Sequence, residues 1–155
     1  LKTFNRSADK SDTHNGFGLN FKITDLQATL GLSQFKNLNE FIDTKRNIYN
    51  QYNKFLRVDG LNNFHNYETP WFIDFTCSSN KEQIKLSNYL GDFGITTRYS
   101  YPALSSQEFL KDTEKVDLNY SESHANRIIW LPSSTNLKSE QIEFISTKIN
   151  EFYNI

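Results

Sequence analysis

The sequence has no methionine and only one cysteine among its 155 residues. A single cysteine excludes an internal disulfide, which suits a reducing compartment, so we expect a cytoplasmic protein. Cys77 ends an apolar run, where a small buried hydrophobic side chain is the expected role rather than a nucleophile. The chain opens with Leu1. If an initiator methionine had preceded it, the bulky leucine in second place would normally have blocked removal of that methionine. We therefore expect that residue 1 is not a natural start, although a proteolysed, truncated or deliberately shortened chain would look the same.

Long apolar runs and an excess of charge of one sign are also missing. No stretch approaches the roughly 18 apolar residues of a membrane span, and the N-terminal residues lack the apolar core of a signal peptide, so we expect no membrane partner. The 17 Lys and Arg residues balance 18 Asp and Glu residues, and the basic residues do not cluster. That balance argues against a nucleic-acid partner. With 37% hydrophobic and 23% charged residues, the composition fits one globular domain with one core.

Motifs of self-sufficient catalytic sites are absent from the sequence as well. His14, His65 and His124 are far apart, and none has metal-ligand spacing to another or to Cys77, so we expect no metal. The chain has neither a glycine-rich phosphate loop followed by Lys-Ser/Thr nor a Gly-x-Ser-x-Gly elbow. No autonomous catalytic site is predicted.

The sequence does contain clear signals for two long helices. Residues 1–19 are polar and glycine-bearing and predict a loop that depends on another part of a protein for order. Thr24 and Gln27 form a capping box, and apolar residues recur every three or four positions after it. This pattern predicts helices at about 24–35 and 37–57, the second of them ended by Asp59-Gly60.

Strands and shorter helices are predicted in the rest of the chain. Aromatic and β-branched residues predict a strand at 70–77, with 61–65 as a weaker antiparallel neighbour. A capping box at Ser79 and Glu82 starts a helix that ends at Gly94. The later elements are a short strand at 95–99, a short helix around 122–127, a buried strand at 128–131 stopped by Pro132, and a helix at about 139–152. The predicted fold class is α/β, as an α+β small domain with long N-terminal helices, a short three- to four-stranded mainly antiparallel sheet, and helices packed on one face.

Two segments carry residues suited to a binding site. In residues 16–22, Asn20 and Lys22 offer an amide and a cation at a helix entrance, which fits an anion site, although spacing alone favours a simple helix-entry turn. In residues 94–102, Arg98 and Tyr101 follow a strand, where side chains often reach a ligand. The alternative is a surface arginine stacked on a tyrosine, which spacing alone slightly favours.

Several stretches, taken in order, carry a family resemblance over nearly the whole chain. They are Gly-Leu-Asn-Phe-Lys and Gln-Ala-Thr-Leu-Gly-Leu-Ser-Gln-Phe within residues 18–35, the Arg46, Tyr49 and Tyr52 pattern, residues 71–74, 94–98, 101–102 and 130–134, and the closing Phe152-Tyr153. Together they resemble the nucleotide-sugar aminotransferases of the DegT/DnrJ/StrS group, in the fold-type I pyridoxal-phosphate superfamily. The resemblance implies amino transfer from glutamate to a nucleotide-linked keto sugar, with pyridoxal 5′-phosphate as the electron sink.

The resemblance also implies roles for individual residues. Asn20 would reach across a homodimer interface to the cofactor phosphate of the neighbouring subunit, so that two subunits share each active site. Lys22 would lie beside it, facing the cofactor or the anionic end of the substrate, as a point charge where many members have a bidentate arginine. Arg98 and Tyr101 would line the cleft for the nucleotide-diphosphate sugar. Ser105 stands where many members have a histidine, so any contact made by that histidine is lost or replaced.

The Schiff-base lysine of the family lies upstream of every motif seen in this chain. The resemblance therefore implies that residues 1–22 belong with a missing large domain and that residues 23–155 form the C-terminal small domain. It also implies that this chain has no catalytic residue and is inactive by itself. Two alternatives stay open: a non-catalytic binding or assembly module descended from the enzyme, and a lysine-less sister dehydratase.

Overall fold

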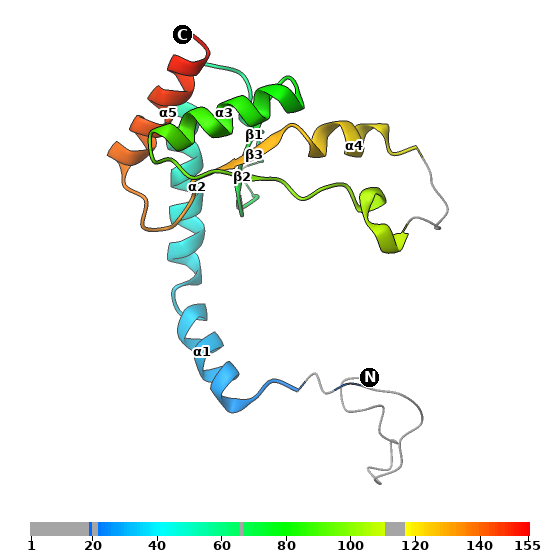
Figure 1. Cartoon of the computed structure of the whole chain (residues 1–155). Helices are drawn as coiled ribbons and strands as arrows, with labels where there is room; N and C mark the ends of the chain where they lie inside the picture. Colours follow the sequence, from blue (N-terminus) through cyan, green and yellow to red (C-terminus); the bar gives the residue numbers. More distant parts are fainter. Residues whose placement is uncertain (1–18, 20–21, 66, 111–116) are drawn as a thin grey trace. The chain divides into compact units, whose positions relative to one another are not determined.

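The computed structural model of the chain describes residues 19, 22–65, 67–110 and 117–155. It divides into two units, Leu1–Glu40 and Phe41–Ile155. The elements are α1 (Asp25–Phe35), α2 (Leu38–Phe55), β1 (Ile73–Thr76), α3 (Asn80–Asp92), β2 (Arg98–Tyr99), two 3-10 turns (Leu104–Ser106 and Glu108–Leu110), α4 (Asn119–Ala125), β3 (Ile128–Leu131) and α5 (Ser139–Phe152) (Figure 1). None of the helices within these described ranges is both long enough and apolar enough to span a membrane.

The first unit contains α1, and its start confirms the predicted capping box. The backbone N–H of Gln27 donates to Thr24 Oγ1 at 3.3 Å, and the N–H of Thr24 donates to Gln27 Oε1 at 2.9 Å. Both amides would otherwise lack a partner at the helix N-terminus. No residue of α1 is buried, and Leu26, Leu30 and Phe35 are largely exposed. The implied domain boundary between residues 22 and 23 stays a prediction.

The second unit is built on an antiparallel sheet. Within the described residues this sheet has three strands in the order β1-β3-β2. The strand predicted at 128–131 is found with the same bounds, whereas the strand predicted at 95–99 is shorter. The weaker candidate at 61–65 contributes a single bridge between Leu61 and Phe75. The last strand in the chain is therefore the central one.

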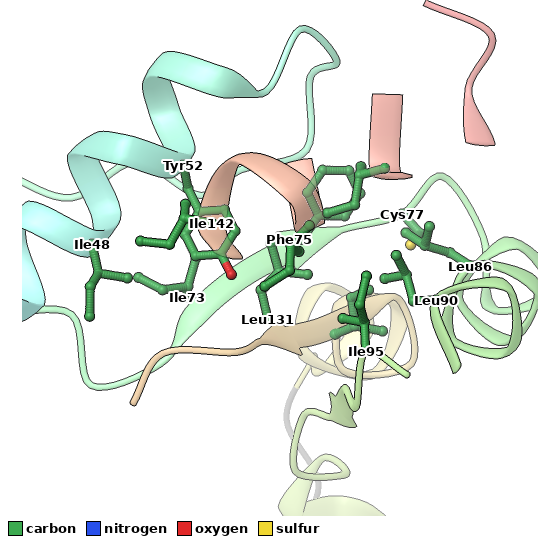
Figure 2. Packing of buried hydrophobic residues seen from close by; sticks show 13 residues of the cluster. Ile48, Tyr52, Ile73, Phe75, Cys77, Leu86, Leu90, Ile95, Leu131 and Ile142 are labelled. Carbon is green, nitrogen blue, oxygen red and sulfur yellow. The ribbon is translucent and has the colours of Figure 1, made fainter. Parts of the chain in front are cut away.

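One face of the sheet holds the hydrophobic core. Because side chains alternate along a strand, Ile73 and Phe75 of β1 and Ile129 and Leu131 of β3 point to the same face, and each is at most 2% exposed. Cys77 is buried in the same core, as predicted. The helices α2, α3 and α5 supply the residues that pack on this face, namely Ile48, Tyr52, Leu86, Leu90, Ile142, Ile145 and Ile149. Figure 2 shows Ile48, Tyr52, Leu86, Leu90 and Ile142 among them. The predicted fold class, with helices packed on one face of a short antiparallel sheet, is confirmed.

The start of α3 differs from the predicted capping box. Ser79 Oγ accepts a hydrogen bond from the Glu82 N–H at 3.2 Å, as expected. The Glu82 carboxylate instead accepts hydrogen bonds from the hydroxyls of Ser78 and Tyr153. The glutamate half of the prediction is wrong because a residue from the end of α5 binds the carboxylate. This bond ties the end of α5 to the start of α3.

Two glycines occupy positions where a side chain would introduce strain. Gly94 follows α3 with φ +73°, a left-handed conformation, and the N–H of Ile95 donates to the Leu90 carbonyl at 3.0 Å. This is the helix end that the sequence predicts. Gly60 lies against Phe75, and a Cβ at this position would be 2.6 Å from the Phe75 Cζ atom. The loop after α2 can therefore approach β1 only because residue 60 has no side chain.

Candidate functional site

The face of the sheet opposite the core carries a row of three polar or aromatic side chains. In the strand register, Trp130 of β3 lies between Asp74 of β1 and Arg98 of β2. Asp74 lies between the core residues Ile73 and Phe75 on β1, and Trp130 lies between the core residues Ile129 and Leu131 on β3, so both point to the outer face. Arg98 is the Cα partner of Trp130 and belongs to the same face. The structure thus places the predicted site residue Arg98 beside Trp130, for which only a place in a buried strand was predicted.

Four side chains form what we call the Trp130 cluster: Phe72, Arg98, Tyr101 and Trp130. The Phe72 ring stacks on the Trp130 ring with centroids 3.8 Å apart, and the Tyr101 ring meets it edge-on at 4.9 Å. The Arg98 Cζ atom lies 5.8 Å from the Trp130 ring centroid, within the range of a cation–π contact. Trp130 is only 7% exposed, whereas Arg98 and Tyr101 are exposed. The two predicted substrate residues are therefore brought together, with the arginine on the tryptophan rather than on the tyrosine.

Asp74 lies beside Trp130 in the strand register, on the side away from Arg98. Its half-buried carboxyl accepts hydrogen bonds from the side chains of Asn62 and Trp130. Burial raises the pKa of the Asp74 carboxyl, and these two hydrogen bonds oppose that rise. Thr76 Oγ1 donates to Asn62 Oδ1 at 2.8 Å, which leaves the Asn62 amide hydrogens to face Asp74. A short polar network therefore ends on the Trp130 ring.

Lys45 of α2 holds the two chain segments that flank this part of the sheet. Its Nζ atom donates to the carbonyl of Ser133 at 2.6 Å and to the carbonyl of Trp71 at 3.1 Å. Burial lowers the pKa of the Lys45 amine. The Trp71 side chain is 78% exposed and meets Phe72 edge-on at 6.3 Å. Lys45 therefore joins the segment before β1 to the segment after β3.

Of the remaining predicted site positions, the structure describes Lys22 and Ser105. Lys22 lies in the first unit and is exposed, and Asn20 lies outside the described residues. The cofactor role of both stays a prediction. Ser105, at the position of the family histidine, donates from Oγ to Glu122 Oε1 at 2.6 Å and so ties the turn Leu104–Ser106 to α4.

A hollow of about 530 Å³ lies elsewhere, where the loop after α3 meets the start of α5. Phe93, Ile95, Leu137, Phe144 and other mostly apolar residues line it. Among the described residues that line it, none is Arg98, Tyr101 or Ser105. In residues 19, 22–65, 67–110 and 117–155, no three His, Cys, Asp or Glu side chains gather as they would around a metal ion.

Comparison with known proteins gives the same family at the level of sequence and of fold. Residues 1–150 match the DegT/DnrJ/EryC1/StrS aminotransferase family. The chain is 31% identical over 150 residues to GDP-perosamine synthase of Escherichia coli O157:H7, covering 90% of this chain and 39% of that protein. It is 27% identical over 150 residues to the dTDP-4-amino-4,6-dideoxy-D-glucose transaminase of Shigella dysenteriae, covering 88% and 40% of the two chains.

The fold matches solved structures equally well. The crystal structure of a DegT DnrJ EryC1 StrS aminotransferase from Brucella abortus aligns over 96% of this chain and 40% of its own, with a TM-score of 0.85 at 21% identity. The chain spans about two fifths of the length of these relatives and corresponds to their C-terminal part. Because the match runs along nearly the whole chain in both sequence and fold, the chain belongs to the DegT/DnrJ/EryC1/StrS aminotransferase family.

Proposed function

We propose that this chain is the C-terminal part of a pyridoxal-phosphate-dependent enzyme that transfers an amino group from glutamate to a keto sugar carried on a nucleoside diphosphate. The observation that carries this proposal is Arg98 held against Trp130 beside Tyr101, on the outer face of the sheet. A guanidinium presents its N–H donors in a fork that matches phosphate oxygens, and a tyrosine hydroxyl can donate to or accept from a sugar hydroxyl. An anionic sugar nucleotide is therefore the substrate class that fits this surface.

The names of two relatives support the same substrate class. One is a GDP-perosamine synthase and the other is a dTDP-4-amino-4,6-dideoxy-D-glucose transaminase. These names differ in the nucleotide and share the diphosphate, which is the group that a guanidinium recognises. We therefore assign Arg98 to the diphosphate and Tyr101 to the sugar.

Asn20 and Lys22 are the residues of this chain that would hold the cofactor phosphate. The capping box occupies the backbone amides of Thr24 and Gln27, so neither of these two amides is available to a phosphate. An amide NH₂ and an ammonium are donors that suit a phosphate. When bound, pyridoxal 5′-phosphate supplies the electron sink for chemistry at the carbon that carries the amino group. This chain contributes binding and orientation.

We propose that the functional unit is a homodimer with shared active sites. In that arrangement Asn20 and Lys22 act on the cofactor of the neighbouring subunit, and the two-fold axis makes the sharing reciprocal. The exposed apolar side chains of α1 support this assembly because subunit interfaces bury such surfaces. The Schiff-base lysine implied by the family lies outside this chain. We therefore expect the chain to be inactive by itself. We also expect the complete enzyme to work in the cytoplasm.

The two half-reactions of the full-length enzyme provide the test. Arg98→Ala should raise the KM for the nucleotide-linked keto sugar about tenfold to a hundredfold, because a hydrogen bond to a charged group contributes about 1.5–3 kcal/mol. The glutamate half-reaction, followed by the cofactor absorbance, should not change. Arg57→Ala, at an exposed position outside the Trp130 cluster, is the matched control. An unchanged KM in Arg98→Ala, or no amino transfer by the full-length protein to a panel of nucleotide-linked keto sugars, would contradict the proposal.

A further inference from the structure

We infer that Trp130 is a positioning residue that presents the Arg98 guanidinium to the substrate diphosphate, an inference that rests on the proposed function. Trp130 itself is too deeply buried to be a major contact surface, since it is 7% exposed. Its part is to give Arg98 one orientation before the substrate arrives.

The Trp130 ring is held on several sides. Phe72 stacks on it with an interplanar angle of 7°, and Tyr101 packs edge-on at 79°. Asp74, the Cα partner of Trp130 on β1, lies on the side of Trp130 away from Arg98. Aromatic packing by two rings restricts the orientation of the indole.

Arg98 depends on this fixed ring for its own position. It is the Cα partner of Trp130 across the β2–β3 pair, and its guanidinium carbon lies 5.8 Å from the ring centroid. An arginine side chain on an exposed strand has many rotamers, and ordering it on binding costs free energy. A cation–π contact with a fixed indole restricts those rotamers in advance. The ring therefore lowers the cost of binding a phosphate at Arg98.

The test measures nucleotide binding in the full-length enzyme. Trp130→Leu should weaken the affinity for GDP or dTDP about tenfold, measured by titration calorimetry, and raise the KM for the keto sugar by the same factor. Trp130→Phe keeps an aromatic face and should restore the affinity to within about threefold of the wild type. The glutamate half-reaction should stay unchanged in both variants. In an Arg98→Ala background, Trp130→Leu should cause no further loss, because Trp130 acts through Arg98.

Ile129→Val is the matched control for a general loss of packing in β3. Ile129 lies on the same strand as Trp130 but faces the core, so its truncation should lower the thermal stability and leave nucleotide affinity unchanged. If Trp130→Leu does not fold, Asp74→Ala takes its place, because it removes the carboxyl beside the indole in the strand register and should weaken affinity in the same direction. A loss of nucleotide affinity in Ile129→Val as large as that in Trp130→Leu would overturn the inference. So would a double variant, Arg98→Ala with Trp130→Leu, whose loss of affinity is the sum of the two single losses. An Arg98→Ala variant with unchanged affinity would instead contradict the proposed function.

Discussion

The buried hydroxyl of Tyr52 donates a hydrogen bond to the backbone carbonyl of Pro132 at 2.8 Å, so α2 is tied to the segment that follows β3. Tyr52→Phe removes the donor and leaves the carbonyl without it, which should lower the free energy of unfolding by about 1–2 kcal/mol. Urea unfolding measures the change. Tyr67→Phe, at a side chain that is 78% exposed, should change the free energy of unfolding by less than about 0.5 kcal/mol. Equal effects of the two substitutions would show that the Tyr52 bond adds nothing.

Gly60 should not tolerate even a methyl group. An added Cβ would lie 2.6 Å from the Cζ atom of the buried Phe75 ring, so Gly60→Ala should lower the free energy of unfolding by about 1–3 kcal/mol. Gly91→Ala is the matched control, because a Cβ at Gly91 in α3 would meet nothing within 4 Å. Alanine is a better helix former than glycine, so Gly91→Ala should preserve or raise stability. A Gly60→Ala variant as stable as Gly91→Ala would contradict the close approach.

Lys45 should stabilise the fold by joining the segment before β1 to the segment after β3. Lys45→Met keeps the length of the side chain but leaves the carbonyls of Trp71 and Ser133 without their donor. We expect the free energy of unfolding to fall by about 1–3 kcal/mol. Lys85→Met, at an exposed position on α3, should change it by less than about 0.5 kcal/mol. Thermal or urea unfolding measures the change in each variant. A Lys45→Met variant with the free energy of unfolding of the wild type would show that the Lys45 hydrogen bonds do not stabilise the fold.

Stability should fall in alkaline solution, partly through Cys77. Burial raises the pKa of the Cys77 thiol from 9.0 to about 11. The folded state therefore binds the thiol proton more tightly than the unfolded state, so this contribution is complete below pH 9 and is lost as the pH rises toward about 11. Its size is on the order of 2 kcal/mol. In Cys77→Ala this pH-dependent part should be absent, and parallel unfolding curves for variant and wild type across that window would contradict the prediction.

Asn20 should control retention of the cofactor in the full-length enzyme. Asn20→Ala removes the amide proposed to bind the phosphate in the neighbouring subunit, and should weaken pyridoxal-phosphate binding about tenfold. Cofactor loss on dialysis, followed by absorbance, measures this. Asn53→Ala, at an exposed position on α2, is the control and should retain the cofactor as the wild type does.

Local signals in the sequence predicted most of the elements. The capping box at Thr24 and the apolar spacing after it place α1 correctly, and the short apolar run stopped by Pro132 gives β3 its observed bounds. These signals need only neighbours along the chain. The errors occur where the local structure depends on a residue that is distant in the sequence. Glu82 leaves its capping box because Tyr153 binds it, and residues 61–65 form a single bridge rather than a strand.

The candidate site could be predicted only in part for the same reason. Arg98 and Tyr101 stand out in the sequence because they lie at or just after the end of a strand signal, and the structure places Arg98 inside β2. Spacing alone cannot tell which ring the arginine meets. That choice depends on the register between β2 and β3, which pairs Arg98 with Trp130. The alternation along residues 128–131 was the one available signal, because it sets Trp130 on the opposite face from Ile129 and Leu131.

The strand order β1-β3-β2 also has a consequence for biosynthesis. Both outer strands leave the ribosome before the segment that they must pair with, so neither can complete its backbone hydrogen bonds until residues 128–131 have been translated. A nascent chain arrested earlier would present β1 and β2 as open edges, which invite pairing with other chains. Chaperone demand during synthesis should therefore be highest in the interval between the emergence of β1 and that of β3.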